Sequence, residues 1–241
     1  MNFLKEEGFE PSKKIFLFDR KQLFAFAVCA AAAAALFFVL NTLELSARTA
    51  VIRIICTLNL GFLLFRLINY IFIQKNFDPS KMLPFHLCGF NVMLCAAAAL
   101  TGNGVLIDIA FGLSPLPALC ALIFPETDAA KYPSFKFRSI EYYFSHLTLV
   151  IAPLYMVRFM EHKPDIANFP SMAAVLAVML IIAAAVNIAA KGNYMYVDHG
   201  PESTPLEFLN AKTGNFLYRV IIIVLFMFSF VITHLIYILL F

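Results

Sequence analysis

Apolar residues fill this chain in long runs that short polar segments separate. A helix needs about 20 mainly apolar residues to cross the roughly 30 Å hydrocarbon core of a bilayer. Seven runs have about this length and carry few charges. They cover residues 22–44, 49–74, 82–101, 104–124, 139–160, 169–190 and 216–241. The pattern therefore predicts an all-α protein, a polytopic transmembrane helical bundle of about seven spans.

The polar segments between these runs are too short to hold a separate soluble domain. We expect a cytoplasmic lead-in at residues 1–21, a single transmembrane domain at 22–241, and a polar cytoplasmic loop at 191–215. Asp108, Gly112, Pro115 and Pro117 interrupt the fourth run, which predicts a broken or re-entrant segment there. The composition agrees, because 62% of residues are hydrophobic and 14% are charged, far from the soluble norm.

Lys and Arg residues at the ends of the runs predict the orientation. Twelve lie on the side of the N-terminus: Lys5, Lys13, Lys14, Arg20, Lys21, Lys75, Lys81, Lys131, Lys136, Arg138, Lys191 and Lys212. Four lie on the other side: Arg48, Arg53, Arg158 and Lys163. Cytoplasmic ends carry the excess of positive charge. We therefore expect the N-terminus in the cytoplasm and, with an odd number of spans, Phe241 outside.

Polar side chains within the spans gather at one depth. At a rise of about 1.5 Å per residue, Arg66 and Asn69 lie about 13 and 9 Å from Lys75, at the cytoplasmic end of their run. His86 and Cys88 are similarly deep in the third run, and so are His146 in the fifth and Asn187 in the sixth. Polar groups are costly in lipid and mark functional sites, so this layer is the candidate site.

The residue types in this layer suit covalent acyl transfer. Such a reaction needs a nucleophile and a base within hydrogen-bond reach, and we assign these roles to Cys88 and His146. Arg66 is the available cation, with Glu141 as its expected ion-pair partner. If Pro84 occupies the first turn of its helix, Cys88 also lies near the positive end of a helix dipole.

The remaining candidates would bind substrate or stabilise an oxyanion. Asn91, Asn69 and His86 are potential hydrogen-bond donors, and Pro84, Cys88, Asn91 and Cys95 share one face of the predicted third helix. The loop Gly192–His199 is expected to fold over the layer as a lid. The full set of these residues is His86, Asn91, Arg66, Asn69, Glu141, Asn187, Asn193, Tyr194 and Tyr196.

Simpler roles exist for each of these side chains. A membrane cysteine is usually an inert small hydrophobe, and buried His and Asn often only join helices. The five cysteines, Cys29, Cys56, Cys88, Cys95 and Cys120, show no metal or disulfide spacing. We expect no metal and no cofactor, and no basic array suggests nucleic acid.

Three short segments carry a family resemblance: Leu83-Pro84-Phe85-His86-Leu87-Cys88, then Ser145-His146 running to Ala152-Pro153-Leu154-Tyr155, then Asn193-Tyr194-Met195-Tyr196. In this order they resemble the motifs of the transmembrane-protein-164 and YwaF-like integral membrane acyltransferase family. The resemblance implies transfer of a fatty acyl group onto lysophospholipids through a cysteine that corresponds to Cys88, with His146 as the matching histidine.

The sequence thus favours a membrane lipid acyltransferase that moves an acyl group from a phospholipid donor to a lysophospholipid through a cysteine acyl-enzyme. Its partners would be membrane phospholipids and lysophospholipids, and its location the plasma (inner) membrane. Three alternatives stay open. They are an intramembrane lipid ester hydrolase, a small-solute transporter whose polar cavity includes Arg66, His146 and the broken fourth span, and a purely structural or assembly role.

Overall fold

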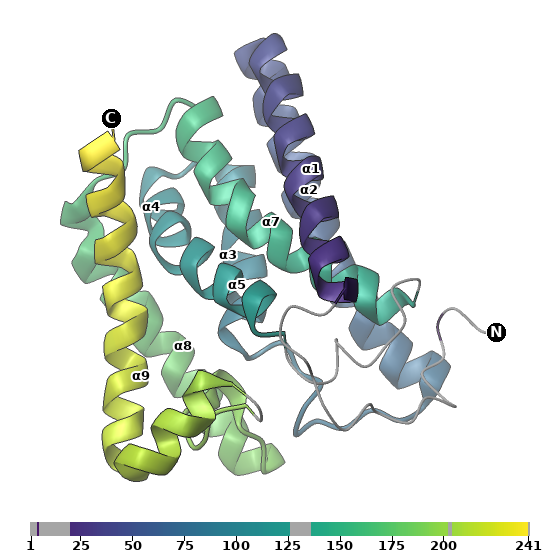
Figure 1. Ribbon diagram of the computed structural model, residues 1–241, viewed down its shortest axis with the longest axis vertical. Helices are drawn as coiled ribbons and strands as arrows, with labels where there is room; N and C mark the ends of the chain where they lie inside the picture. The colour runs from purple at the N-terminus through teal and green to yellow at the C-terminus, as the bar shows by residue number, and fades with distance from the viewer. Residues whose placement is uncertain (1–3, 5–19, 126–135, 202–203, 241) are drawn as a thin grey trace.

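The computed structural model describes residue 4 and residues 20–125, 136–201 and 204–240, so most of the expected lead-in at 1–21 lies outside the described residues. These segments fold into helices and short connections (Figure 1). The α-helices and their bounds are α1 (Arg20–Thr42), α2 (Leu45–Ile68), α3 (Leu87–Thr101), α4 (Gly104–Leu113), α5 (Pro115–Ile123), α7 (Phe137–Phe159), α8 (Phe169–Ala190) and α9 (Pro205–Leu240). The all-α prediction is confirmed.

Within the described parts of the chain, six helical segments are long and apolar enough to cross a membrane. They are Gln22–Thr42, Leu45–Gln74, Gly104–Ile123, Phe137–Phe159, Ile166–Ala190 and Pro205–Leu239. Five of them coincide closely with predicted runs. The sixth begins at Pro205, so the prediction of a loop up to residue 215 is wrong for the part that forms the start of α9. Such a set of apolar helices is that of an integral multi-pass membrane protein.

The third predicted span is shorter than expected. Its helix α3 begins at Leu87 and has 15 residues, a length of about 22 Å that is less than the bilayer core. The placement of Pro84 in the first helical turn, on one helix face with Cys88, is wrong, because Pro84 precedes the helix. His86 is the N-cap, with extended backbone (φ −73°, ψ 157°).

The fourth run is broken as predicted, between α4 and α5 at Ser114. Breaking a helix inside a bilayer exposes backbone carbonyl groups that need hydrogen-bond donors. Ser229 of α9 donates to the carbonyl of Gly112 at 2.8 Å, and Asn91 of α3 donates to that of Leu113 at 2.9 Å. The break is therefore closed by side chains of neighbouring helices.

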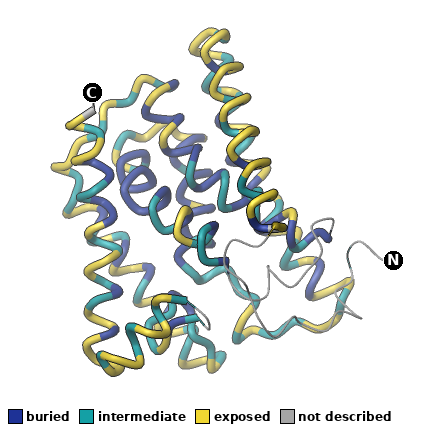
Figure 2. Tube along the Cα trace, viewed as in Figure 1, coloured by how far each residue is buried: buried dark blue, intermediate teal, exposed yellow. Residues whose placement is uncertain are grey.

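Buried residues concentrate in the middle of the bundle, on α3, α4 and α7 (Figure 2). Helix α2 packs against both α3 and α7, α5 packs against α7, and α4 against α9. The outer helices α1 and α9 keep apolar side chains exposed, for example Phe38 and Leu239. In a membrane protein these outward apolar side chains are the surface that faces lipid.

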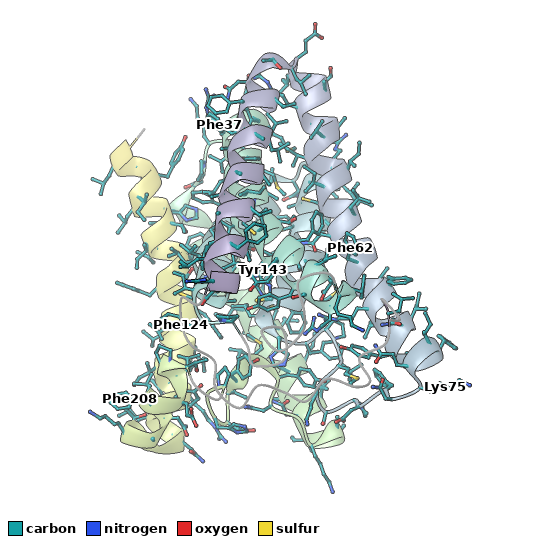
Figure 3. The ribbon with its side chains drawn as sticks, turned by 45° about the vertical axis from the view of Figure 1, so that its right-hand side comes forward. Phe37, Phe62, Lys75, Phe124, Tyr143 and Phe208 are labelled. Atoms are coloured by element: carbon teal, nitrogen blue, oxygen red, sulfur yellow. The ribbon has the colours of Figure 1, made fainter. Side chains whose placement is uncertain are left out.

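Helix α9 bends at Gly214, whose backbone has φ 74° and ψ 165°. The short part before the bend carries Phe208, and it lies at the same end of the bundle as Lys75, which ends the α2 segment (Figure 3). Phe37 lies toward the opposite end (Figure 3). The predicted cytoplasmic loop and the end of the second span therefore share one end of the molecule.

Candidate functional site

A buried carboxylate joins two arginines between α2 and α7. Glu141 accepts from Arg66 at 3.1 Å and from Arg138 at 2.5 Å. The Glu141 side chain is 3% exposed, and those of Arg66 and Arg138 are 17% and 15% exposed. The predicted Arg66–Glu141 pair is confirmed. Because each guanidinium would be costly at this depth without a counter-charge, the carboxylate allows both to lie inside the bundle.

His146 lies on α7, five residues after Glu141. Its Nδ1 is 2.8 Å from the carbonyl oxygen of Tyr142. Since a carbonyl only accepts hydrogen bonds, Nδ1 carries a proton, and in the neutral imidazole Nε2 then carries the lone pair. His146 also interacts electrostatically with Glu141. This tautomer is the one in which Nε2 can act as a base.

Cys88 is the second residue of α3 and is half-buried. The first N–H groups of a helix have no acceptor within that helix, and together they form the positive end of its dipole. This position favours a thiolate and places backbone donors next to it. The sequence predicted this dipole contribution, although for a helix with an earlier start.

Gly89, next to Cys88, allows the chain before α3 to approach the helix closely. A Cβ atom at Gly89 would lie 2.4 Å from the carbonyl oxygen of Pro84, far inside van der Waals contact. The turn from Pro84 to Leu87 therefore depends on glycine at this position.

We expect Gly89→Ala to destabilise the protein by about 1–3 kcal/mol, because the backbone at Pro84 must move. Gly61→Ala is the matched control, since Gly61 lies in α2, where an added Cβ atom would have no heavy atom within 4 Å. The control should be neutral or stabilising by up to about 1 kcal/mol. Thermal unfolding in detergent micelles measures both, and equal midpoints for the two variants would contradict the close approach.

The segment after α8 folds back over the chain that leads into α3. Tyr194 is fully buried, and its ring contacts those of Phe85 and His86, with centroids 6.1 and 4.9 Å away. The Tyr196 ring lies 4.6 Å from His86. Burial raises the pKa of the Tyr194 phenol, so its hydroxyl stays protonated.

Hydrogen bonds fasten this segment at both ends. The Tyr194 hydroxyl donates to the Pro79 carbonyl at 2.6 Å and accepts from the Leu83 N–H at 3.0 Å. Asn187 Oδ1 accepts from the Tyr194 N–H at 2.6 Å. The segment therefore packs on the extended chain before α3, where Tyr194 satisfies backbone groups of Pro79 and Leu83, and its role as a lid over a site stays a prediction.

Asn193 holds the turn of the lid itself. Its side chain accepts from the Asp198 N–H at 3.1 Å and donates to the His199 carbonyl at 2.8 Å. Arg219 of α9 pairs with the Asp198 carboxylate at 2.5 Å. The lid is therefore attached to α8 and to α9 as well as to the start of α3.

Asn91 and Asn69, two of the predicted site residues, donate to backbone carbonyl groups. The amide of Asn91 is engaged with the Leu113 carbonyl at the α4–α5 break. Asn69 begins a π-helical turn, Asn69–Gln74, and its Nδ2 lies 3.4 Å from the Leu4 carbonyl. A π-helical turn is rare and is frequent at functional sites.

A polar cluster at the other end of the bundle was not assigned a role from the sequence. Asp108 of α4, 1% exposed, accepts from His162 Nε2 at 2.6 Å and from Asn168 Nδ2 at 2.6 Å. The sequence pattern assigned Asp108 only to the interruption of the fourth run. An acidic residue within an apolar run is a signal that a partner should be sought, and His162 was the available one.

A family comparison decides the classification. The family model described as the TMEM164 family matches residues 17–239. The chain belongs to the TMEM164 family. The match covers the helices named above except for the last residue of α9, and it confirms the resemblance seen in the sequence motifs. No match was found among curated proteins or among solved structures.

Among the described residues, no group of three or more His, Cys, Asp or Glu side chains is arranged to hold a metal ion. In this TMEM164-family chain, the lid tyrosines contact His86 at the start of α3. The buried ion pair and His146 lie on α2 and α7, and both of these helices pack against α3.

Proposed function

We propose that this protein is a membrane lipid acyltransferase, with Cys88 as the nucleophile and His146 as the base. The observation that carries the proposal is the environment of the α3 N-terminus. Cys88 is at the positive end of α3, α3 packs against α7, and His146 on α7 is held in the tautomer that leaves Nε2 as the basic nitrogen.

The first half-reaction forms an acyl-enzyme. His146 Nε2 takes the proton from the Cys88 thiol, and the thiolate attacks the ester carbonyl carbon of a phospholipid. The tetrahedral intermediate collapses when its carbon–oxygen bond breaks, and the departing alkoxide takes the proton back from the imidazolium. The products are a lysophospholipid and a thioester on Cys88.

The second half-reaction transfers the acyl group. His146 takes the proton from the hydroxyl of an acceptor lysophospholipid, whose oxygen attacks the thioester carbonyl carbon. The carbon–sulfur bond breaks, and the thiolate regains a proton from the imidazolium. Nothing in this cycle requires a cofactor, because the acyl group, the electron pair and the proton all come from the lipids and these two residues.

The charge on each tetrahedral oxygen needs preorganised donors. The proposal assigns this role to the backbone N–H groups of Leu87 and Cys88, which begin α3, together with His86. The Asn91 amide has no role in the proposed reaction, because it donates to the Leu113 carbonyl. Arg66, Asn69 and Glu141 in turn would line the headgroup end of the site at the cytoplasmic leaflet of the plasma (inner) membrane.

The closure of the α4–α5 break disfavours the transporter alternative. A transported solute needs backbone groups that line an open path, whereas the carbonyls at this break accept from Ser229 and Asn91. Hydrolysis differs from transfer only in the second half-reaction, where water replaces the lysophospholipid.

Intact-mass spectrometry tests the proposal. Purified protein is incubated with phospholipid and lysophospholipid, and the wild type is compared with Cys88→Ala and with Cys120→Ala, a control at an exposed cysteine. We expect a hydroxylamine-sensitive acyl adduct on the wild type and the control only, with acylated lysophospholipid as product. Free fatty acid as the only product would establish the hydrolase, and absence of adduct and product would overturn the proposal.

A further inference from the structure

Tyr142 holds the imidazole of His146 from two directions. Its carbonyl accepts from Nδ1, and its ring lies against the imidazole with centroids 4.2 Å apart and planes inclined by 39°. Any residue at position 142 would supply the carbonyl. The ring contact depends on the tyrosine side chain, which therefore needs a fixed orientation of its own.

The end of α5 supplies that fixed orientation. The Tyr142 hydroxyl donates to the Ala121 carbonyl at 2.6 Å, and Tyr142 is 4% exposed. Ala121 is in the last turn of α5, where carbonyl groups have no N–H partner within the helix. The phenol thus satisfies a terminal carbonyl of one helix while its ring contacts a histidine of another.

The other terminal carbonyls of α5 are also satisfied. The Phe124 N–H donates to the Cys120 carbonyl at 2.8 Å. Gln22 of α1, 4% exposed, donates to the carbonyls of Leu122 at 3.2 Å and Ile123 at 2.7 Å. The end of α5 is therefore fixed by α1 and by α7, and it is a rigid support for the Tyr142 hydroxyl.

We propose that Tyr142 is a positioning residue, which orients the His146 imidazole through its ring and is itself oriented by the hydrogen bond to the Ala121 carbonyl. This inference rests on the proposed function, in which His146 is the base for Cys88. The hydroxyl touches neither of the two reacting groups in this proposal. By fixing the ring, the hydroxyl restricts the rotation of the ring and of the imidazole before the reaction begins.

Tyr142→Phe is the informative variant, because it keeps the ring and removes the anchor. We expect alkylation of Cys88 at neutral pH to become about five- to tenfold slower, which corresponds to the loss of about one hydrogen bond. The pH at which alkylation reaches half its maximal rate should also move upward by about half a unit to one unit. The upward direction follows because a poorly oriented imidazole accepts the thiol proton less readily.

Tyr155→Phe is a matched control in the same helix. The Tyr155 hydroxyl donates to the Ala33 carbonyl at 2.7 Å, and Tyr155 is 9% exposed. Its ring contacts Phe37 and Phe159. The control loses an equivalent buried hydrogen bond at a distance from His146, so it should leave the alkylation profile of Cys88 unchanged.

The experiment measures alkylation of Cys88 by iodoacetamide in detergent-solubilised full-length protein across pH, with site-resolved mass spectrometry. Cys120, next to Ala121, gives an internal reference for local unfolding. Equal profiles for wild type and Tyr142→Phe, or the same shift in Tyr155→Phe, would overturn the inference.

A variant that lacks His146 distinguishes a failure of this inference from a failure of the proposed function. If the wild type and His146→Ala gave the same Cys88 profile, the proposed function would fail before Tyr142 is considered. If His146→Ala altered the profile, then adding Tyr142→Phe to it should change nothing more. A further loss in the double variant would show that Tyr142 acts without His146 and would contradict the positioning role.

Discussion

His146→Ala is expected to slow acylation of Cys88 by about 10²–10⁴-fold, the range for loss of a positioned general base. The imidazole would deprotonate the thiol before attack and return the proton to the leaving alkoxide. Without it, only the small thiolate population of the free thiol reacts. Formation of the hydroxylamine-sensitive adduct over time, followed by intact-mass spectrometry, measures the rate.

His199→Ala is the control for this experiment. His199 is exposed on the lid, on the same side of the bundle, and its carbonyl rather than its ring holds the lid turn. This variant should acylate at nearly the wild-type rate. A large loss in His199→Ala with little loss in His146→Ala would transfer the role of base to the lid histidine.

Glu141→Gln is expected to lower the free energy of unfolding by about 3–5 kcal/mol, the cost of breaking a buried pair by removing one partner. The carboxylate is 3% exposed and contacts both Arg66 and Arg138. A neutral amide leaves the two guanidinium groups near each other without a counter-charge. Chemical unfolding in detergent, followed by circular dichroism, measures the change.

Asp198→Asn is the matched control for that prediction. Asp198 pairs with Arg219 at 2.5 Å, as short as the Arg138–Glu141 contact, but these side chains are 42% and 52% exposed. Exposed ion pairs contribute about 0–1 kcal/mol, so the control should lose little. Similar losses in both variants would show that burial of Glu141 is not what makes its ion pair important.

The predictions for His146→Ala and Glu141→Gln both concern the polar layer, which has two physical requirements. The polar layer must hold charged groups inside a mostly apolar bundle, and in the proposed function it must also leave a base and a thiol reactive. Glu141 meets the first requirement by serving two arginines. The Tyr142 carbonyl meets the second for His146, because it occupies Nδ1 and leaves the basic nitrogen at Nε2.

The sequence by itself determined the fold class and the approximate positions of most helices. Long apolar runs specify helices in lipid because each backbone group must be hydrogen-bonded within its own segment. The break in the fourth run was predictable from Pro115, which has no N–H to donate. The Arg66–Glu141 pair was also predictable, since a lone guanidinium at that depth requires a carboxylate.

Only the tertiary structure decided which neighbours the polar groups meet. The start of α3 at Leu87 depends on Tyr194, more than a hundred residues away, which accepts from the Leu83 N–H and so stabilises a non-helical segment. The hydrogen bond between Asp108 and His162 and the one from Tyr142 to the Ala121 carbonyl likewise join segments distant in sequence. Periodicity gives the depth and face of a side chain, whereas its partner depends on how the helices pack.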